Sequence, residues 1–440
     1  MATCSVLPVS AVLHGQELAQ QVVNELLQHA GSEIVVVDAV DAAAVDQPLA
    51  VLVVSGGTEG DVLKAWRARQ QLVPGEPLVL IAHRGHNSLP AALEALARVQ
   101  ADGGRAGIVM LDTDAQNDRD HADHAGQDDH AGQDDPEHDP DHDDSDEHHG
   151  TVADALHGAQ VWHRLHHARL GRVGAPSEWL VASTPTPDAV HRRWGVEVVD
   201  ISLPEVIDRF EENIDAPIAV PIRLAARPHD HTPHPAEVET AARFEPVLRA
   251  EVAAQRLAAV TVRCFDLIGT QHTTGCLALS AVNDSGTIAG CEGDVASTLA
   301  MLWVKELTGR RTWMANPAVI DRSTGVVELA HCTVPLSMVD GYHLDTHFES
   351  GIGVGITGEL PPGPVTLMRL GGPELELLWC ADGEARTTVP REQRCRTQVD
   401  VVISPDAAGE LLDHPLGNHL VMLYGHHADE LRSWWRTHIA

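Results

Sequence analysis

Four polar side chains suited to acid–base or metal chemistry lie in otherwise apolar stretches of the C-terminal half of the sequence. They are Glu292 in CEGD, Asn316 in WMANP, His331 in LAHC and His419 in GNHL. A carboxylate can take up or release a proton, and carboxylate, imidazole and amide groups can all hold a divalent metal ion. Each residue taken alone is a weak signal, because a single buried histidine is more often structural than catalytic. Their order and spacing along the chain are more informative than any one of them.

Asp294 follows Glu292 closely, at the junction between an apolar strand and a strongly amphipathic helix. The free N–H groups and the dipole of a helix N-terminus favour an ionised carboxylate at such a junction. Two interpretations of Asp294 stay open at this point. Either it caps the helix that follows, or it belongs to the site.

The elements that must carry these residues begin with a region in which strands and helices alternate. Apolar runs such as LAVLVVSGGT (49–58) and PLVLIAHR (77–84) are typical of buried parallel strands, and segments with apolar residues three and four apart predict helices between them. A second α/β region follows residue 150, with a long helix expected near 236–258. From about residue 316 the sequence changes to strands separated by turns such as PPGP, which favours a barrel or sandwich.

The predicted fold class is therefore α/β, with two doubly wound parallel-sheet domains followed by a β-rich, barrel-like C-terminal domain. The expected boundaries are 1–111 for the N-terminal α/β domain, 112–150 for an insertion, 151–315 for the second α/β domain and 316–440 for the β-rich domain. In the helix predicted directly after the insertion, His163 and His167 are four residues apart. We interpret this pair as a solvated helix face, although the spacing would also suit a metal ion.

The acidity of the chain is concentrated in one segment. The 440 residues carry a formal net charge of −34, which argues against nucleic-acid and membrane partners. Residues 112–149 contain sixteen Asp or Glu, one Arg and seven of the 28 histidines, and HAGQDD occurs there twice in tandem. A segment so poor in apolar residues predicts a disordered insertion. Two functions stay open for it: a solvated linker, or a loop that collects zinc, nickel or cobalt.

Two further features bear on the cellular compartment. No apolar run is long enough to span a membrane, and the N-terminus lacks the basic and apolar regions of a signal peptide, so a soluble, cytoplasmic protein is expected. The seven cysteines are scattered, odd in number and without a CxxC pair. That pattern argues against a disulfide framework or a zinc ribbon and predicts reduced, mostly buried thiols.

Taken in order, the motifs of the C-terminal half resemble those of the L-fucose isomerase and L-arabinose isomerase superfamily, in particular its shorter fucose-isomerase-like branch. The motifs are CFDLIGTQHTTGCLALS, CEGDVASTLAML, LAHCTVP, HFESGIGVGITGELPPGPVTLMRLGG and GNHLVMLYGHHADEL. The N-terminal half agrees more loosely, through LVVSGGTE and NSLPAALEALARV. The resemblance implies a metal-dependent isomerase, with Mn²⁺ as its divalent ion. Such an enzyme interconverts the aldose and ketose forms of a fucose-type, arabinose-type or modified monosaccharide through a cis-enediol.

By this resemblance Glu292 matches the family's first carboxylate, which both binds metal and serves as acid or base. His419 matches the C-terminal histidine ligand, and His331 lies where the arabinose isomerases have an additional metal histidine. The superfamily's active site lies between the second α/β domain and the β-rich domain, and the first domain of a neighbouring subunit often completes it. The resemblance therefore also implies a homo-oligomer, either a trimer or a hexamer.

The family's second carboxylate, which shares the catalytic and metal-binding roles, corresponds here to Asn316. A neutral amide can ligate a metal but cannot act as an acid or base. Three hypotheses stay open. The chain is an isomerase whose proton relay uses water, Asp294 or the sugar hydroxyls; it is a sugar-binding or regulatory paralogue with an altered metal site; or the functional carboxylate is Asp321, five residues further on.

Overall fold

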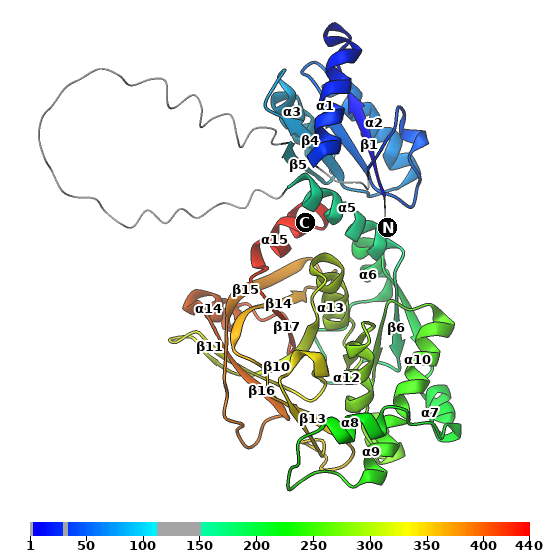
Figure 1. Cartoon of the computed structure of the whole chain (residues 1–440), viewed down its shortest axis with the longest axis vertical. Helices are drawn as coiled ribbons and strands as arrows, with labels where there is room; N and C mark the ends of the chain where they lie inside the picture. Colours follow the sequence, from blue (N-terminus) through cyan, green and yellow to red (C-terminus); the bar gives the residue numbers. More distant parts are fainter. Residues whose placement is uncertain (1–2, 30–33, 112–150) are drawn as a thin grey trace, which may run out of the picture. The chain divides into compact units, whose positions relative to one another are not determined.

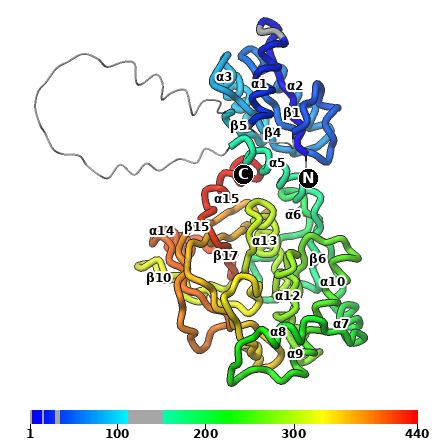
Figure 2. Tube along the Cα trace, in the orientation of Figure 1, coloured from blue at the N-terminus to red at the C-terminus, as the bar shows by residue number. Residues whose placement is uncertain are grey.

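The computed structural model of the chain describes residues 3–29, 34–111 and 151–440. The chain divides into two compact units, Met1–His163 and Arg164–Ala440 (Figures 1 and 2). The Asp- and His-rich insertion, and both hypotheses about its function, fall outside the described residues. No helix in the described part of the chain is long and apolar enough to cross a membrane.

The first unit is built on a five-stranded parallel sheet with the strand order β2-β1-β3-β4-β5. Its strands are β1 Cys4–Val9, β2 Ile34–Val36, β3 Leu49–Val53, β4 Leu78–His83 and β5 Ala106–Leu111, and its helices are α1 Gly15–His29, α2 Glu59–Leu72, α3 Ser88–Ala101 and α5 Val152–His166. One hydrophobic cluster joins the sheet to α2 and α3, and another joins it to α1 and α5. The apolar side chains of β3 and β4 are buried because helices cover the sheet on both faces.

Helix α5 corrects the interpretation of His163 as part of a solvated face. The His163 side chain is 5% exposed, and its Nε2 lies 2.6 Å from Oε1 of Glu76, which also pairs with the buried Arg69. His167 lies beyond the C-terminal end of the helix. The helical pattern alone could not show this, because the carboxylate that receives His163 comes from a loop 87 residues earlier in the chain.

The second unit begins with a four-stranded parallel sheet in the order β7-β6-β8-β9. The strands are β6 Arg169–Val173, β7 Glu197–Ile201, β8 Ala259–Val262 and β9 Ile288–Cys291, and the helices are α6 Pro187–Trp194, α7 Leu203–Glu212, α8 Ala219–Ala225, α9 Pro235–Ala242, α10 Phe244–Gln255, α11 Asp266–Gln271, α12 Cys276–Asp284 and α13 Val295–Thr308. The single long helix expected near 236–258 is in fact α9 and α10. Pro246 has no N–H to donate to the carbonyl of Ala242, which interrupts the helix there.

The C-terminal part of this unit is a closed antiparallel barrel with the strand order β10-β11-β16-β15-β14-β17. Its strands are β10 Thr312–Asp321, β11 Val326–His331, β14 Gly363–Gly371, β15 Leu377–Arg386, β16 Thr397–Ile403 and β17 Leu420–Tyr424; β12 Tyr342–Asp345 and β13 Gly355–Gly358 form a separate ribbon, and α14 Pro405–Asp413 and α15 Ala428–His438 flank the last strand. Inward-facing side chains fill the barrel as one hydrophobic cluster. The predicted fold class, two parallel-sheet regions followed by a β-rich barrel, is confirmed.

Helices α12 and α13 join the second parallel sheet to the barrel (Figures 1 and 2). Helix α13 packs against β8 and β9 of the sheet and against β10, β14 and β17 of the barrel. Its burial is correspondingly high, from Val295 through Val304. The end of β9 and the ends of several barrel strands therefore meet near the N-terminus of one rigid helix, which is where the candidate residues lie.

Candidate active site

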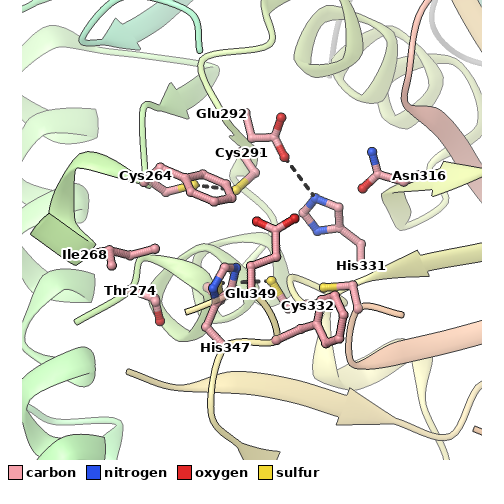
Figure 3. A pocket seen from close by; sticks show the side chains of 14 residues that line it. Cys264, Ile268, Thr274, Cys291, Glu292, Asn316, His331, Cys332, His347 and Glu349 are labelled. Carbon is pink, nitrogen blue, oxygen red and sulfur yellow. Dashed lines mark hydrogen bonds and ion pairs between the residues drawn. The ribbon is translucent and has the colours of Figure 1, made fainter. Parts of the chain in front are cut away.

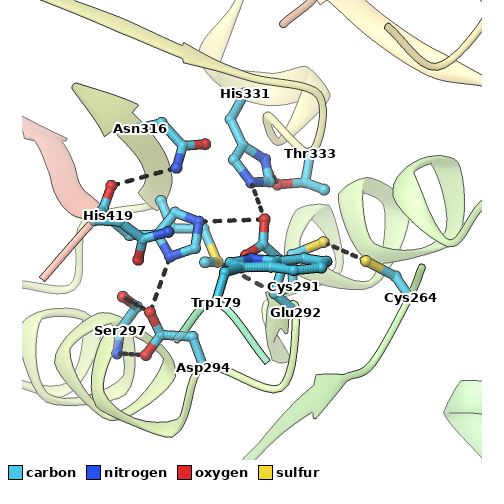
Figure 4. A network of polar contacts seen from close by, with 12 residues as sticks. Trp179, Cys264, Cys291, Glu292, Asp294, Ser297, Asn316, His331, Thr333 and His419 are labelled. Carbon is cyan, nitrogen blue, oxygen red and sulfur yellow. Dashed lines mark hydrogen bonds and ion pairs between the residues drawn. The ribbon is translucent and has the colours of Figure 1, made fainter. Parts of the chain in front are cut away.

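Glu292, His331 and His419 converge although they come from three separate elements (Figure 4). Glu292 follows the last residue of β9, His331 is the last residue of β11, and His419 directly precedes β17. One ligand atom from each of the three side chains lies within 4.8 Å of the other two, and all three residues are buried. Nε2 of His419 is 3.5 Å from Oε1 of Glu292, and Nε2 of His331 is 4.0 Å from the same oxygen.

The backbone at Glu292 has an unusual conformation that aims its side chain into the cluster. Glu292 has a φ of 64° and Gly293 a φ of 71°, so two consecutive residues adopt the left-handed region. A Cβ on residue 293 would lie 2.8 Å from Cα of Pro176, so only glycine fits there. Trp179 also fixes the Glu292 side chain by donating its Nε1–H to Oε2 of Glu292 at 2.6 Å. One carboxylate oxygen is thus held by Trp179 while the other faces the two imidazoles.

Asp294 has both of the roles considered from its sequence position: it caps a helix and it belongs to the site. It is the N-cap of α13, because its Oδ1 accepts a hydrogen bond of 2.8 Å from the backbone N–H of Ser297. Its Oδ2 also lies 2.9 Å from Nδ1 of His419 and 3.3 Å from a guanidinium nitrogen of Arg369. A buried carboxylate that orients the imidazole of a candidate ligand in this way is typical of metal sites in proteins.

The charges within the cluster follow from burial and from these contacts. Burial raises the pKa of the Glu292 carboxyl, but His419, His331 and Trp179 outweigh it, so the pKa is lowered overall. Burial lowers the pKa of His331 to about 3. Burial would also lower the pKa of His419, but the carboxylates of Asp294 and Glu292 raise it to about 9. At neutral pH and without a metal ion, His419 is therefore a cation between two carboxylates and His331 is neutral.

Asn316 and Asp321 lie on the same strand, β10, but only Asn316 borders the site. Asn316 lines the same cavity as Glu292 and His331, and its Nδ2 donates to the backbone carbonyl of Asn418 at 3.3 Å. Asp321 is the last residue of β10, where its Oδ1 accepts hydrogen bonds from Ser323. The structure therefore places the neutral Asn316, and not Asp321, beside the candidate metal ligands.

A cavity extends from Glu292 toward α11, α12 and the loop after β12 (Figure 3). Its volume is about 60 Å³, which is smaller than the roughly 300–1,000 Å³ typical of small-molecule sites. Glu349 and His347 line it from the loop after β12, and aromatic side chains Phe265 and Phe348 contribute apolar walls. Five of the seven cysteines also line it: Cys264, Cys276, Cys291, Cys332 and Cys395.

Three of these neighbours were not predicted from the sequence: Trp179, His347 and Glu349. Trp179 lies in a segment between β6 and α6 that carries no recognisable motif, so no sequence signal could have placed it next to Glu292. His347 and Glu349 stand in the HFESG segment that carried the family resemblance, and their polarity within a glycine-rich run was a usable signal. The cysteines gave none, because they are separated by up to 131 residues in the chain.

The buried donor set fits a divalent metal ion. One carboxylate oxygen and two imidazole nitrogens are ligands for borderline and moderately hard divalent ions, Mn²⁺ among them. Nε2 of His419 is completely buried, and its contact with Oε1 of Glu292 at 3.5 Å is longer than an ordinary hydrogen bond. A metal ion between this nitrogen and the Glu292 carboxylate would be held by both groups. The arrangement defines a candidate metal centre, two of whose residues, Glu292 and His331, line the cavity.

Comparison with known proteins leads to one kind of enzyme. No family model matches the chain. Sulfoquinovose isomerase of Clostridium sp. (strain MSTE9) is 23% identical over 288 residues, which cover 63% of this chain and 64% of that protein. Sulfoquinovose isomerases of Alkalicoccus urumqiensis and Priestia aryabhattai are 26% and 24% identical over 157 and 194 residues, covering 34% and 42% of this chain and 35% and 43% of their own. The matched stretch thus spans less than two thirds of each relative, and the similarity is to named sugar isomerases.

Proposed function

We propose that this chain is a metal-dependent aldose–ketose isomerase that acts on a monosaccharide through a cis-enediol, in the fucose-isomerase-like branch of its superfamily. The observation that carries the proposal is the convergence of Glu292, His331 and His419, the first two of which line a cavity. The similarity to sulfoquinovose isomerases supports the same class of reaction.

Glu292, His331 and His419 would hold the metal ion, for which Mn²⁺ is our choice. When bound, such an ion polarises neighbouring sugar oxygens and stabilises the negative charge of the enediolate. Asn316 borders the same space and offers a neutral amide oxygen as a further ligand. Asp294 would fix the ring of His419, with Nδ1 toward Asp294 and Nε2 toward Glu292.

Proton transfer in this proposal starts from Glu292. Its pKa is lowered, so the carboxylate is ionised at neutral pH and can accept a proton from a carbon next to the sugar carbonyl. Trp179 holds Oε2 at 2.6 Å, which leaves Oε1 on the side of the imidazoles. Trp179 is therefore a positioning residue for the carboxylate in this mechanism.

The second proton-transfer group cannot be Asn316, and we assign this role to Glu349. Glu349 lines the cavity from the loop after β12, and its carboxylate points into the space bordered by His331 and His347 (Figure 3). In its protonated form the Glu349 carboxyl would donate a proton to the carbonyl oxygen while the Glu292 carboxylate takes a proton from carbon. The isomerase would then have two carboxylates, Glu292 and Glu349, and the second would lie on the loop after β12 and not on β10.

For the substrate we propose a sulfonated sugar, sulfoquinovose, on the basis of the relatives' names. A sulfonate needs a cationic partner, and among the described residues that line the cavity there is neither lysine nor arginine. The guanidinium of Arg396 lies 6.0 Å from the ring centre of the cavity-lining Phe348 and pairs with Asp345 at 3.4 Å. We assign this arginine to the sulfonate. Substitution Arg396→Met should raise KM for sulfoquinovose and leave KM for glucose unchanged.

A direct test follows solvent deuterium. Protein loaded with Mn²⁺ is incubated in D₂O with sulfoquinovose, glucose, L-fucose or L-arabinose, and deuterium at C1 or C2 is measured by NMR. We expect exchange with at least one sugar and its loss in Glu292→Gln. Glu306→Gln is the matched control, because Glu306 lies on α13 and pairs with Arg164 outside the cavity. No exchange with any sugar would contradict the proposal.

Asn316 favours a second candidate function, a sugar-binding or regulatory paralogue with an altered metal site. That alternative predicts tight sugar binding without deuterium exchange, and binding that persists after the metal is chelated. Isothermal titration with and without a chelator separates the two candidates. Light scattering on the same samples tests the accompanying proposal of a trimer or hexamer.

A further inference from the structure

Five cysteines that are scattered in the sequence line one cavity, in two pairs and a single residue. Sγ of Cys264 lies 2.8 Å from Sγ of Cys291, and Sγ of Cys332 lies 3.1 Å from Sγ of Cys276. All seven cysteines of the chain are free, and all except Cys395 are buried. The expectation of mostly buried thiols is confirmed, yet their clustering is a feature that their spacing in the sequence did not suggest.

One of the two pairs has a histidine beside it. The ligand atoms of Cys276, Cys332 and His347 all lie within 4.8 Å of one another, and the three residues are buried. They come from the start of α12, the residue after β11 and the loop after β12. Cys395 also interacts with the thiol of Cys332 and lines the same cavity. Two or three thiols with one imidazole are the donor set of structural zinc sites.

The surroundings hold His347 in an orientation that suits a ligand. Its Nδ1 lies 3.1 Å from Oγ of Ser350, which leaves Nε2 for the thiol side. The backbone N–H of His347 donates to Ile352 at 3.1 Å, and the ring of Phe265 packs against the imidazole at a centroid distance of 5.4 Å. The loop that carries His347 is therefore held by a hydrogen bond within the loop and by the contact with Phe265, which directly precedes α11.

We infer that Cys276, Cys332 and His347 form a binding site for a thiophilic divalent cation such as Zn²⁺, with Cys395 as the fourth ligand. Each thiol loses a proton on binding, so metal uptake releases protons and strengthens with pH. Zinc–sulfur bonds of about 2.3 Å in a tetrahedron place two sulfurs about 3.8 Å apart, so the Cys276 and Cys332 sulfurs need to separate by less than about 1 Å. The bound ion would tie α12, β11 and the loop after β12 into one wall of the cavity.

The new site differs in chemistry from the Glu292 centre and does not depend on the proposed isomerase function. Thiolates select Zn²⁺ and its relatives, whereas the carboxylate and imidazoles of the Glu292 centre suit harder ions. The cavity would thus hold two sites with different metal preferences, joined through the neighbouring residues His331 and Cys332. Zn²⁺ would also compete with Mn²⁺ for the imidazoles and carboxylate of the Glu292 centre, so it is the thiolates that distinguish the new site.

Binding of Co²⁺ tests the inference, because Co²⁺ has a near-ultraviolet charge-transfer band when thiolates bind it and lacks this band at sites without thiolates. The full chain is reduced, stripped of metal with a chelator and titrated with Co²⁺, and the thiolate-to-cobalt charge-transfer band in the near ultraviolet is recorded. We expect one equivalent of Co²⁺ to produce the band and Zn²⁺ to abolish it. Cys276→Ser and Cys332→Ser should each weaken Co²⁺ binding at least about tenfold, whereas Cys395→Ser should weaken it less.

Two control variants make the outcome specific. Cys264→Ser alters the other cysteine pair of the same cavity, and Glu292→Gln alters the isomerase site; both should leave the cobalt band unchanged. Absence of the band in the reduced wild-type protein, its survival in Cys276→Ser, or its loss in Cys264→Ser would overturn the inference. A loss of isomerase activity in Glu292→Gln with an intact cobalt band would separate the two sites.

A measurement on the unmodified sequence guards against variants that fail to fold. The wild-type protein is treated with a thiol-alkylating reagent with and without Zn²⁺, and the labelled peptides are identified by mass spectrometry. Zn²⁺ should slow the alkylation of Cys276 and Cys332 and leave that of Cys264 and Cys291 unchanged. Equal rates with and without Zn²⁺ would contradict the site, as would a Cys276–Cys332 disulfide that resists reduction.

Discussion

Nδ1 of His419 lies 2.9 Å from Oδ2 of Asp294, and both side chains are completely buried. Asp294 at the same time caps α13 and faces the guanidinium of Arg369. One carboxylate therefore joins the start of a helix, a buried cation and the imidazole at the candidate metal centre. The stability of the second unit and the geometry of its site depend on the same side chain.

The substitution Asp294→Asn separates these roles. Asparagine is a good N-cap, so the helix start is retained, but the charge opposite Arg369 and His419 is lost. We expect a destabilisation of about 3–5 kcal/mol, because a buried arginine is left without its counter-ion. Mn²⁺ affinity should fall about 10- to 100-fold, since His419 loses its orienting carboxylate. Urea unfolding and isothermal titration measure the two effects.

Ser404→Ala is the control for the capping role of Asp294. Ser404 caps α14 by accepting a hydrogen bond from the backbone N–H of Ala407, and it is not one of the site residues. Its loss should cost about 1 kcal/mol and leave Mn²⁺ affinity unchanged. If Asp294→Asn and Ser404→Ala destabilise the protein equally and neither changes metal binding, the coupling described for Asp294 is wrong.

Glu349→Gln tests the assignment of the second proton-transfer group. We expect kcat to fall by about 10²- to 10⁴-fold with little change in Mn²⁺ affinity, because the carboxylate transfers a proton without holding the metal. Glu292→Gln should instead lose both activity and metal binding. Steady-state kinetics and titration with Mn²⁺ provide the comparison. A Glu349→Gln enzyme with wild-type kcat would leave the acid role to another group.

Asn316→Asp restores a carboxylate where the family resemblance expects one. Adding one negative charge to a small ligand set strengthens divalent binding, and we expect Mn²⁺ affinity to rise by about tenfold. Asn316→Ala, which removes the amide altogether, should lower the affinity. Both affinities are measured by titration under identical conditions. A decrease in affinity for Asn316→Asp would show that residue 316 does not face the ion.

The two histidines of the site give the metal-free protein opposite pH dependences. The pKa of His331 falls from its ordinary 6.5 to about 3 on folding, so its stabilising contribution is lost as pH drops from about 6.5 toward 3. The pKa of His419 rises to about 9, so its contribution is complete below about pH 6.5 and lost as pH rises through 9. Together they favour folding most near pH 6.5. Thermal unfolding of chelator-treated protein across this range measures the effect.

His331→Asn is the informative variant for this pH profile. It removes the buried imidazole that must take up a proton in acid, so the loss of stability between pH 6.5 and 3 should become shallower. The alkaline side, which depends on His419, should keep its shape. An acid side identical to that of the wild-type protein would assign the pH dependence to other groups.

In the first unit the buried ion pair between Glu76 and Arg69 should contribute to the free energy of unfolding. Oε1 of Glu76 also lies 2.6 Å from Nε2 of His163, and all three side chains are 5% exposed or less. Glu76→Gln leaves a buried arginine unpaired and should cost about 3–5 kcal/mol. Asp61→Asn, which breaks an exposed pair with Lys64, should cost about 0–1 kcal/mol. Hydrogen exchange of peptides from β3 and β4 distinguishes the two, and equal exchange would contradict the prediction.

Periodicity predicted the fold class because the strands differ so clearly in pattern. The continuous apolar runs of β3 and β4 are those of a sheet buried on both faces, whereas β16 alternates buried and half-buried residues as a barrel strand does. The break between α9 and α10 was missed because the apolar spacing continues across it, although Pro246 was visible. The burial of His163 was missed because its partner Glu76 lies in a distant loop.

The candidate site was predictable only where a motif carried it. Glu292, His331 and His419 were singled out from CEGD, LAHC and GNHL, and the fold brings them together. Their approach depends on three strand ends meeting beside α13, which residue types alone do not encode. Trp179 and the cysteine cluster stayed hidden for the same reason, since their proximity is a property of packing between elements that are distant in sequence.

The left-handed backbone at Glu292 has a consequence for how the sequence can change. A non-glycine residue at a φ of 64° costs about 1–2 kcal/mol, which glycine would not incur. A single change to glycine would therefore relieve the chain while removing the carboxylate on which the proposed chemistry depends. Selection for stability alone would favour that change. Glutamate at this position therefore lowers the stability of the fold slightly and supplies the carboxylate that the proposed reaction needs.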